Sequence, residues 1–179
     1  TSEYITRDLN TGRFDFFCGG ITIPSRKTES AKLFRKGSNG IEFFTSQVLY
    51  NGNKIKKMLK HYDDICEKNG VMPRRILLSF APVSSKKNID FLKWLGVEIP
   101  ENTEHRLNQD PENMSNVSLE IASEILKDIL QNNEEKEITV PIGLNVEHIM
   151  SYNFQSSINM LQKLSRIYRE FCIKTSLYD

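Results

Sequence analysis

The chain has 179 residues, of which 39% are hydrophobic, so it is long enough to bury one sizeable core. Its 24 Lys and Arg residues nearly balance its 23 Asp and Glu residues, and the resulting net charge of +1 argues against nucleic acid or an anionic membrane as a partner. No apolar run approaches the roughly 20 residues that span a bilayer. Cys18, Cys66 and Cys172 are far apart and form no paired motif, so neither a disulfide framework nor a metal site is predicted, and a cytoplasmic location is expected.

Four segments rich in aromatic and branched residues predict strands, and helical spacing of apolar residues follows each of them. The strands are expected at Phe14–Ile23, Ile41–Tyr50, Arg75–Ala81 and Ile138–Val146. A long helix is expected from about Ser115, and a last helix after the fourth strand. The segment from Val97 to Asn113 contains two prolines and is expected to be a loop.

Strands that are apolar nearly throughout and alternate with helices are typical of parallel βαβ units, so the predicted fold class is α/β. Polar residues gather where the predicted strands end. They are Thr22, Arg26, Gln47, Ser84, Asn145 and Glu147. In folds of this kind the carboxyl ends of the strands form the face that binds ligands. The sequence therefore predicts one shared site at this face.

Gln47 is the most informative of these residues. The two-residue period of a strand places Thr45 and Gln47 on the same side of Ile41–Tyr50, a segment expected to be buried on both faces. A buried Gln amide offers two donors and an acceptor, and leaving it unpaired costs roughly 1–3 kcal/mol. Either a heteroaromatic ligand or the neighbouring backbone satisfies it.

Several motifs in order along the chain carry a family resemblance. They are Gly19 to Arg26 (Gly-Gly-Ile-Thr-Ile-Pro-Ser-Arg), Phe44 to Asn51, Ile76 to Val83, Gly96 to Pro100, and Asn145 to Glu147 (Asn-Val-Glu). Together they resemble the methylenetetrahydrofolate reductases, flavoproteins built as eight-stranded (β/α) barrels. The resemblance implies a TIM-barrel type of fold, of which this chain, as a single domain over residues 1–179, supplies strands five to eight.

The first half of the family's barrel has no counterpart in these residues. That half carries the family's general acid, so no catalytic residue is assigned here. Four strands cannot close an eight-stranded barrel, which implies a homo-oligomer, a completing barrel half, or a lost N-terminal part. The chain begins with Thr1 rather than Met, and a fragment or a processed product is expected.

The resemblance assigns folate contacts residue by residue. Gln47 takes the position that holds the pterin ring, and Asn88 falls within one residue of a substrate-contacting Gln, with Lys87 as an equal candidate. Asn145 and Glu147 lie on the family's eighth strand. Val146 stands where well-studied members have an Arg that contacts folate, so Glu147 is expected either to reach the amine edge of the ligand or to cap the last helix.

The resemblance also implies the cofactors. Arg35 and Lys36 have the family's spacing for residues near the flavin phosphates, and Arg26 lies near another flavin contact; the alternative is a solvated basic helix face. FAD is the implied cofactor, with NAD(P)H as electron donor. The implied function is the flavin-dependent reduction of methylenetetrahydrofolate to methyltetrahydrofolate in one-carbon metabolism. The alternatives are a folate-binding protein that performs no reduction, and a (β/α) module of unrelated function.

Overall fold

The computed structural model describes residues 16–175 and has the predicted α/β organisation, with a helix after every strand. Phe14 and Asp15, expected to begin the first strand, lie outside the described residues. The elements are β1 (Gly19–Thr22), α2 (Glu29–Ser38), β2 (Phe43–Ser46), α3 (Gly52–Lys68), β3 (Arg75–Phe80), α4 (Lys86–Trp94), α5 (Glu101–Gln109), α6 (Met114–Glu135), β4 (Ile142–Val146), η1 (Ser151–Asn153) and α7 (Phe154–Thr175).

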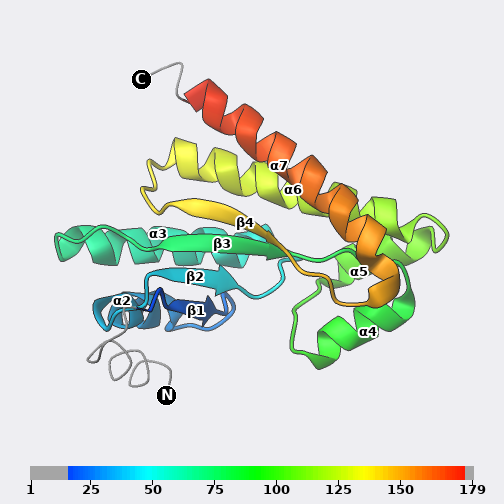
Figure 1. The fold of residues 1–179 in the computed structure, drawn as a ribbon, viewed down its shortest axis with the longest axis horizontal. Helices are drawn as coiled ribbons and strands as arrows, with labels where there is room; N and C mark the ends of the chain where they lie inside the picture. Colours follow the sequence, from blue (N-terminus) through cyan, green and yellow to red (C-terminus); the bar gives the residue numbers. More distant parts are fainter. Residues whose placement is uncertain (1–15, 176–179) are drawn as a thin grey trace.

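The four strands form one parallel sheet in the order β1-β2-β3-β4, which confirms the prediction of parallel strands in chain order. In Figure 1 the strands run in the same direction, and α4, α5 and the beginning of α7 lie beyond their carboxyl ends. All the strand ends therefore meet at one edge of the sheet. This is the edge at which the sequence predicted a site.

One face of the sheet packs against the helices. The side chains of Phe44, Ile76 and Leu78 point toward the helices and have no exposed surface. They join a core that includes Leu59 of α3 and Leu126 of α6. Burial of each such side chain stabilises the fold by about 1.5–3 kcal/mol. The helical layer therefore holds the sheet from one side.

The opposite face of the sheet is partly open, which corrects the prediction that the Ile41–Tyr50 strand is buried on both faces. Ile21 is 67% exposed, and Thr45 beside it in the register is half-buried. The ring of Phe17 stacks on Phe43 at 5.3 Å between centroids. The sheet therefore has apolar side chains on both faces, but the described helices cover only one of them. We call it the open face.

The predicted loop from Val97 to Asn113 is wrong in its centre, where α5 forms. Pro100 immediately precedes the helix, and Glu101 and Glu104 in the first turn favour its positive N-terminal end. Leu107 is the one fully buried residue of α5 and joins a second, smaller core with Val83 and α4. A helix with a single buried residue shows no apolar period in the sequence, and the flanking prolines mark its boundaries rather than a loop.

All four predicted strands are longer than the observed ones: residues 16–18 and Ile23 lie outside β1, and Ala81 follows β3. Residues 41–42 and 47–50 flank β2, and residues 138–141 precede β4 as irregular backbone. Asp63 of α3 holds the segment of residues 138–141, since its carboxylate accepts from the N–H and the hydroxyl of Thr139, at 3.2 and 2.6 Å. Within residues 16–175, no helix has the length and apolar character needed to cross a membrane.

Candidate functional site

Three polar side chains stand in one row on the open face at the carboxyl edge of the sheet. Ser79 of β3 pairs with Asn145 of β4. Thr45 of β2 pairs with Leu77, two residues before Ser79, so Thr45 lies on the same face, and Gln47 follows two residues after Thr45. The Nδ2 of Asn145 donates to the Oγ of Ser79 at 3.0 Å and lies 3.5 Å from the Oε1 of Glu147. We call Gln47, Ser79, Asn145 and Glu147 the polar ladder.

Ser46 joins the ends of β2 and β3 behind the polar ladder. Its hydroxyl accepts from the backbone N–H of Ser79 and donates to the backbone carbonyl of Gln47, both at 2.9 Å. Gln47 N–H in turn donates to the carbonyl of Thr22 at 2.8 Å. These bonds fix the backbone where the strands end, so the ladder is held by the sheet rather than by a free loop.

A mostly apolar hollow of about 250 Å³ lies over this edge. Its walls come from the ends of β1 and β2, from α4 and the turn after it, and from the segment after β4. The lining residues are Ile21, Ile23, Thr45, Ser46, Gln47, Val48, Leu92, Leu95, Val97, Glu147 and Ile149. An apolar cavity with a few convergent polar groups is the usual form of a small-molecule site. We call it the strand-end hollow.

Glu147 is the charged member of the strand-end hollow. Burial raises the pKa of its carboxyl, and the hydroxyl of Ser79 partly offsets that rise. Within the part of the chain that the structure describes, no Lys, Arg or His forms an ion pair with it. No contact among the described residues supports the alternative role as a cap of the last helix. Met150 is the N-cap residue of η1, which has no side-chain cap, and the N–H of Asn153 donates to the Met150 carbonyl.

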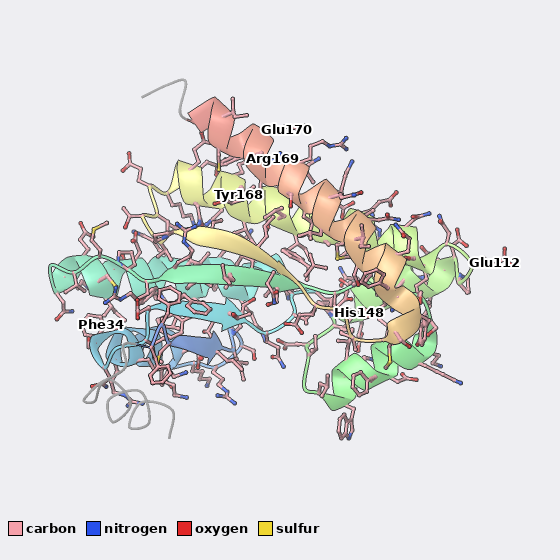
Figure 2. All side chains as sticks on the ribbon, viewed as in Figure 1. Phe34, Glu112, His148, Tyr168, Arg169 and Glu170 are labelled. Carbon is pink, nitrogen blue, oxygen red and sulfur yellow. The ribbon has the colours of Figure 1, made fainter. Side chains whose placement is uncertain are left out.

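The segment that carries Glu147 continues toward α7. Figure 2 labels His148 there, beside the start of that helix. The imidazole of His148 packs edge-on against the ring of Phe154, with centroids 5.4 Å apart. His148 does not line the strand-end hollow.

Gln47 faces the hollow with its amide only weakly engaged. The Nε2 donates to the carbonyl of Leu95 at 3.4 Å, a long bond, and the side chain is half-buried. The two expected partners of this amide are thus compatible: the backbone holds it loosely, and it lines a cavity in which a ligand would find it.

Asn88 does not line the hollow. It is 2% exposed, and its Oδ1 accepts from the N–H of Ser84 and the Nδ2 of Asn153, while its own Nδ2 donates to the hydroxyl of Tyr152 at 2.6 Å. Ser84 also donates to Asn153, at 2.6 Å. These residues form a joint between α4 and the start of α7, which lies behind the α4 wall of the hollow.

Thr22 likewise lies away from the polar ladder, on the helical side of β1. It has no exposed surface, and its hydroxyl donates to the Oε1 of Glu29 at 3.3 Å. Of the polar residues predicted at the strand ends, the fold therefore brings Gln47, Asn145 and Glu147 together. Ser79 was missed, although a Ser within the apolar run Leu77-Leu78-Ser79-Phe80 is the kind of signal that identifies such a residue.

The three basic residues lie around β1, at one end of the strand order. Arg26 is exposed in the turn after β1, and Arg35 and Lys36 are in the last turn of α2. The Nζ of Lys36 donates to the backbone carbonyl of Ile21 at 2.9 Å. Ile21 also lines the strand-end hollow, so Lys36 contacts a residue of its wall.

A larger hollow of about 430 Å³ lies between the start of α3 and the helices α5 and α6. Its charged groups already pair with one another or with neighbours. Arg106 bonds Glu124 at 2.6 Å, and Asp128 pairs with Lys56 at 2.6 Å. Internal pairing leaves less reason for a ligand here than at the strand-end hollow, where Glu147 lacks a cation among the described residues.

Comparisons of sequence and structure relate the chain to known proteins. The sequence model of the methylenetetrahydrofolate reductase family matches residues 18–165. Among solved structures, an uncharacterized protein from Clostridium thermocellum that binds two copies of 5-methyl-5,6,7,8-tetrahydrofolic acid is similar, with a TM-score of 0.75 and 25% sequence identity. The similarity covers 93% of this chain and 57% of that one, so the chain spans little more than half the length of that protein. No curated protein matches the chain.

Proposed function

Because the chain belongs to the methylenetetrahydrofolate reductase family, we propose that it binds a reduced folate with the pterin ring in the strand-end hollow. The observation that carries the proposal is an apolar hollow whose polar groups all come from the carboxyl edge of a parallel sheet. The similar protein from Clostridium thermocellum, which binds 5-methyltetrahydrofolate, supports the same ligand class.

The hollow suits one end of a folate. Its 250 Å³ are below the roughly 300–1,000 Å³ of a pocket that encloses a whole drug-sized ligand. The bicyclic ring therefore enters, and the p-aminobenzoyl and glutamate portions extend outward. Leu92, Leu95 and Val97 cover the faces of the ring, while Gln47 and Glu147 bond its polar edges and Asn145 holds Glu147 in place. Asn88 contributes from behind, by holding α4 in place.

The fuller proposal is a flavin-dependent reductase that converts methylenetetrahydrofolate to methyltetrahydrofolate. Arg26, Arg35 and Lys36 supply the cationic groups that a flavin diphosphate needs, and they come from one side of the sheet, around β1. FAD held there would supply the hydride chemistry, with NAD(P)H as its reductant. The chain's own part in this scheme is to position the folate ring and exclude water from it.

A binding protein without reductase activity is the second candidate. Among residues 16–175, Glu147 is the one carboxyl that lines the hollow, and it follows the last strand rather than lying on the first. The family's general acid on the first strand of its barrel has no equivalent in these residues. A chain that keeps the pterin contacts and lacks that acid would bind folate without reducing it.

The proposed assembly is half of a (β/α)8 barrel in a single domain, completed by a second copy or by another barrel half. The open face of the four-stranded sheet corresponds to the interior of such a barrel. A cytoplasmic location accords with folate metabolism as the proposed role.

Purified protein tests the proposal directly. Calorimetric titration with 5-methyltetrahydrofolate is expected to show saturable binding, and an absorption spectrum reports whether flavin copurifies. Flavin that NADH or NADPH bleaches, together with turnover of methylenetetrahydrofolate, supports the reductase. Folate binding by a colourless protein supports the binding protein. Absence of folate binding, with flavin added or not, contradicts both.

A further inference from the structure

Glu147 stands apart from the other residues of the strand-end hollow by its charge. The remaining lining residues, from β1, β2, α4 and the segment after β4, are all uncharged. An acidic side chain in an apolar cavity is costly unless something bonds to it. The carboxylate of Glu147 therefore needs hydrogen-bond donors around it.

The polar ladder supplies some of these donors. The amide Nδ2 of Asn145 approaches the Oε1 of Glu147 at 3.5 Å, and the hydroxyl of Ser79 bonds its carboxyl group. Both neighbours are neutral donors. An ionised carboxylate has about four acceptor positions, so acceptor capacity is left over. Among the described residues no cation and no helix N–H takes it up.

A ligand that matches this acceptor capacity brings two adjacent N–H donors in one plane. A planar N–C–N edge with two parallel N–H groups bonds a carboxylate with both of its oxygens, in the way that Arg does. The 2-amino-4-oxopyrimidine part of a pterin has such an edge, formed by its ring N–H and its 2-amino group. A ring that lacks the amino group offers one donor instead of two.

We propose that Glu147 is the residue that selects the ring, by binding the 2-amino and adjacent ring N–H edge of a pterin with its carboxylate. The inference rests on the proposed folate binding and goes further by fixing the ring's orientation. The amino edge points to the end of β4, and the amide of Gln47, the residue after β2, bonds other polar atoms of the ring. Ser79 and Asn145 are positioning residues that hold the carboxylate by its remaining lone pairs.

The test compares two ligands on two proteins by calorimetry. The ligands are 5-methyltetrahydrofolate and its analogue with a methyl group in place of the 2-amino group. Wild-type protein is expected to bind the parent folate about 10- to 100-fold more tightly than the analogue, the range for loss of a hydrogen bond to a charged group. In Glu147→Gln this preference is expected to disappear, because the amide presents one acceptor and one donor. Glu112→Gln, which changes an exposed carboxylate on the loop between α5 and α6 (Figure 2), is expected to keep the wild-type preference.

The outcomes separate this inference from the proposed function. If the wild type binds neither ligand, folate binding itself fails. If the wild type binds folate and Glu147→Gln keeps the full preference for the amino group, only the role of Glu147 fails. A loss of preference in Gln47→Ala without one in Glu147→Gln would assign the role to Gln47 and equally overturn the inference. Should Glu147→Gln not fold, Glu147→Asp, which retracts the carboxylate, is expected to reduce the same preference.

Discussion

Ser79 has no exposed surface, yet it connects three strands at the edge where they end. Its N–H donates to Ser46, its carbonyl accepts from Leu49 at 2.9 Å, and its hydroxyl bonds both Asn145 and Glu147. A buried hydroxyl with all its partners inside the protein stiffens what it holds. The ligand-facing groups of the site thus rest on an internal hydrogen-bond network at the level of single residues.

At this scale, Gln47→Ala tests the pterin contact. The substitution is expected to weaken 5-methyltetrahydrofolate binding by roughly 1–3 kcal/mol, because the ring loses a donor and acceptor pair inside the hollow. Flavin binding is expected to change little. Calorimetry on the folded protein provides the measurement. A purely structural Gln47 would produce the reverse pattern, a lower melting temperature with wild-type folate affinity.

The raised pKa of Glu147 predicts a pH dependence of stability in the ligand-free protein. The folded state keeps the proton to a higher pH than the unfolded state, in which Glu titrates near about 4.3. Between these two pKa values the folded state binds more protons, so this group makes the unfolding free energy fall as pH rises. Urea titrations of wild type and Glu147→Gln across this window are expected to differ by that slope, with the variant relatively more stable at neutral pH. Parallel pH profiles would show that burial does not penalise the charge.

At the scale of elements, the joint of Ser84, Asn88, Tyr152 and Asn153 connects the end of the sheet to two helices. The Nδ2 of Asn153 bonds the carbonyl of Pro82 after β3, at 3.3 Å, as well as Asn88 at the start of α4. Asn153 itself is 1% exposed and belongs to η1, just before α7. α4 supplies Leu92 and Leu95 to the hollow, so this joint sets the position of one wall.

Replacement of Asn153 by Ala is expected to lower the unfolding free energy by about 2–3 kcal/mol, since the bonds of its side chain to Pro82, Ser84 and Asn88 are lost. Urea denaturation measures the effect. Asn159→Ala changes an exposed Asn one turn and a half further along α7 and is expected to stay within about 0.5 kcal/mol of wild type. Similar stabilities for the two variants would show that the joint contributes nothing beyond an ordinary surface amide.

Asn88→Ala distinguishes a structural role of Asn88 in the joint from a direct contact with folate. Because its amide is satisfied inside the joint, the variant is expected to be less stable while the folded fraction keeps folate affinity close to wild type. A drop in affinity comparable to that of Gln47→Ala, with unchanged stability, would instead restore a direct folate contact.

At the scale of the whole molecule, the open face is the surface that the proposed assembly would cover. A sheet covered by helices on one side leaves apolar groups such as Ile21 and Phe17 accessible on the other, and both are more than half exposed. Patches of this kind mark interaction surfaces. The proposed closure of the barrel covers them and surrounds the strand-end hollow with further residues.

Light scattering after size-exclusion chromatography is expected to show a dimer, or a complex with a completing half. Ile21→Asp places a charge on the open face and is expected to weaken that assembly while the monomer stays folded, because Ile21 is 67% exposed. Leu161→Asp, a similar change at a 47% exposed site on α7, is expected to leave assembly intact. A monodisperse wild-type monomer would count against the half-barrel arrangement.

The sequence by itself determined the α/β class, the parallel order and the strand-end location of Gln47, Asn145 and Glu147. These features follow from the spacing of apolar residues and from short motifs, both of which involve residues that are close in sequence. Only the tertiary structure showed how far each face is buried. β2 has one aromatic side chain on each face, Phe43 and Phe44, but helices cover only the face of Phe44. The fate of each polar residue also depended on contacts distant in sequence. Thr22 turned to Glu29 on the helical side, and Asn88 became part of a joint with residues more than 60 positions away. Such pairings are set by three-dimensional packing, which no local pattern encodes.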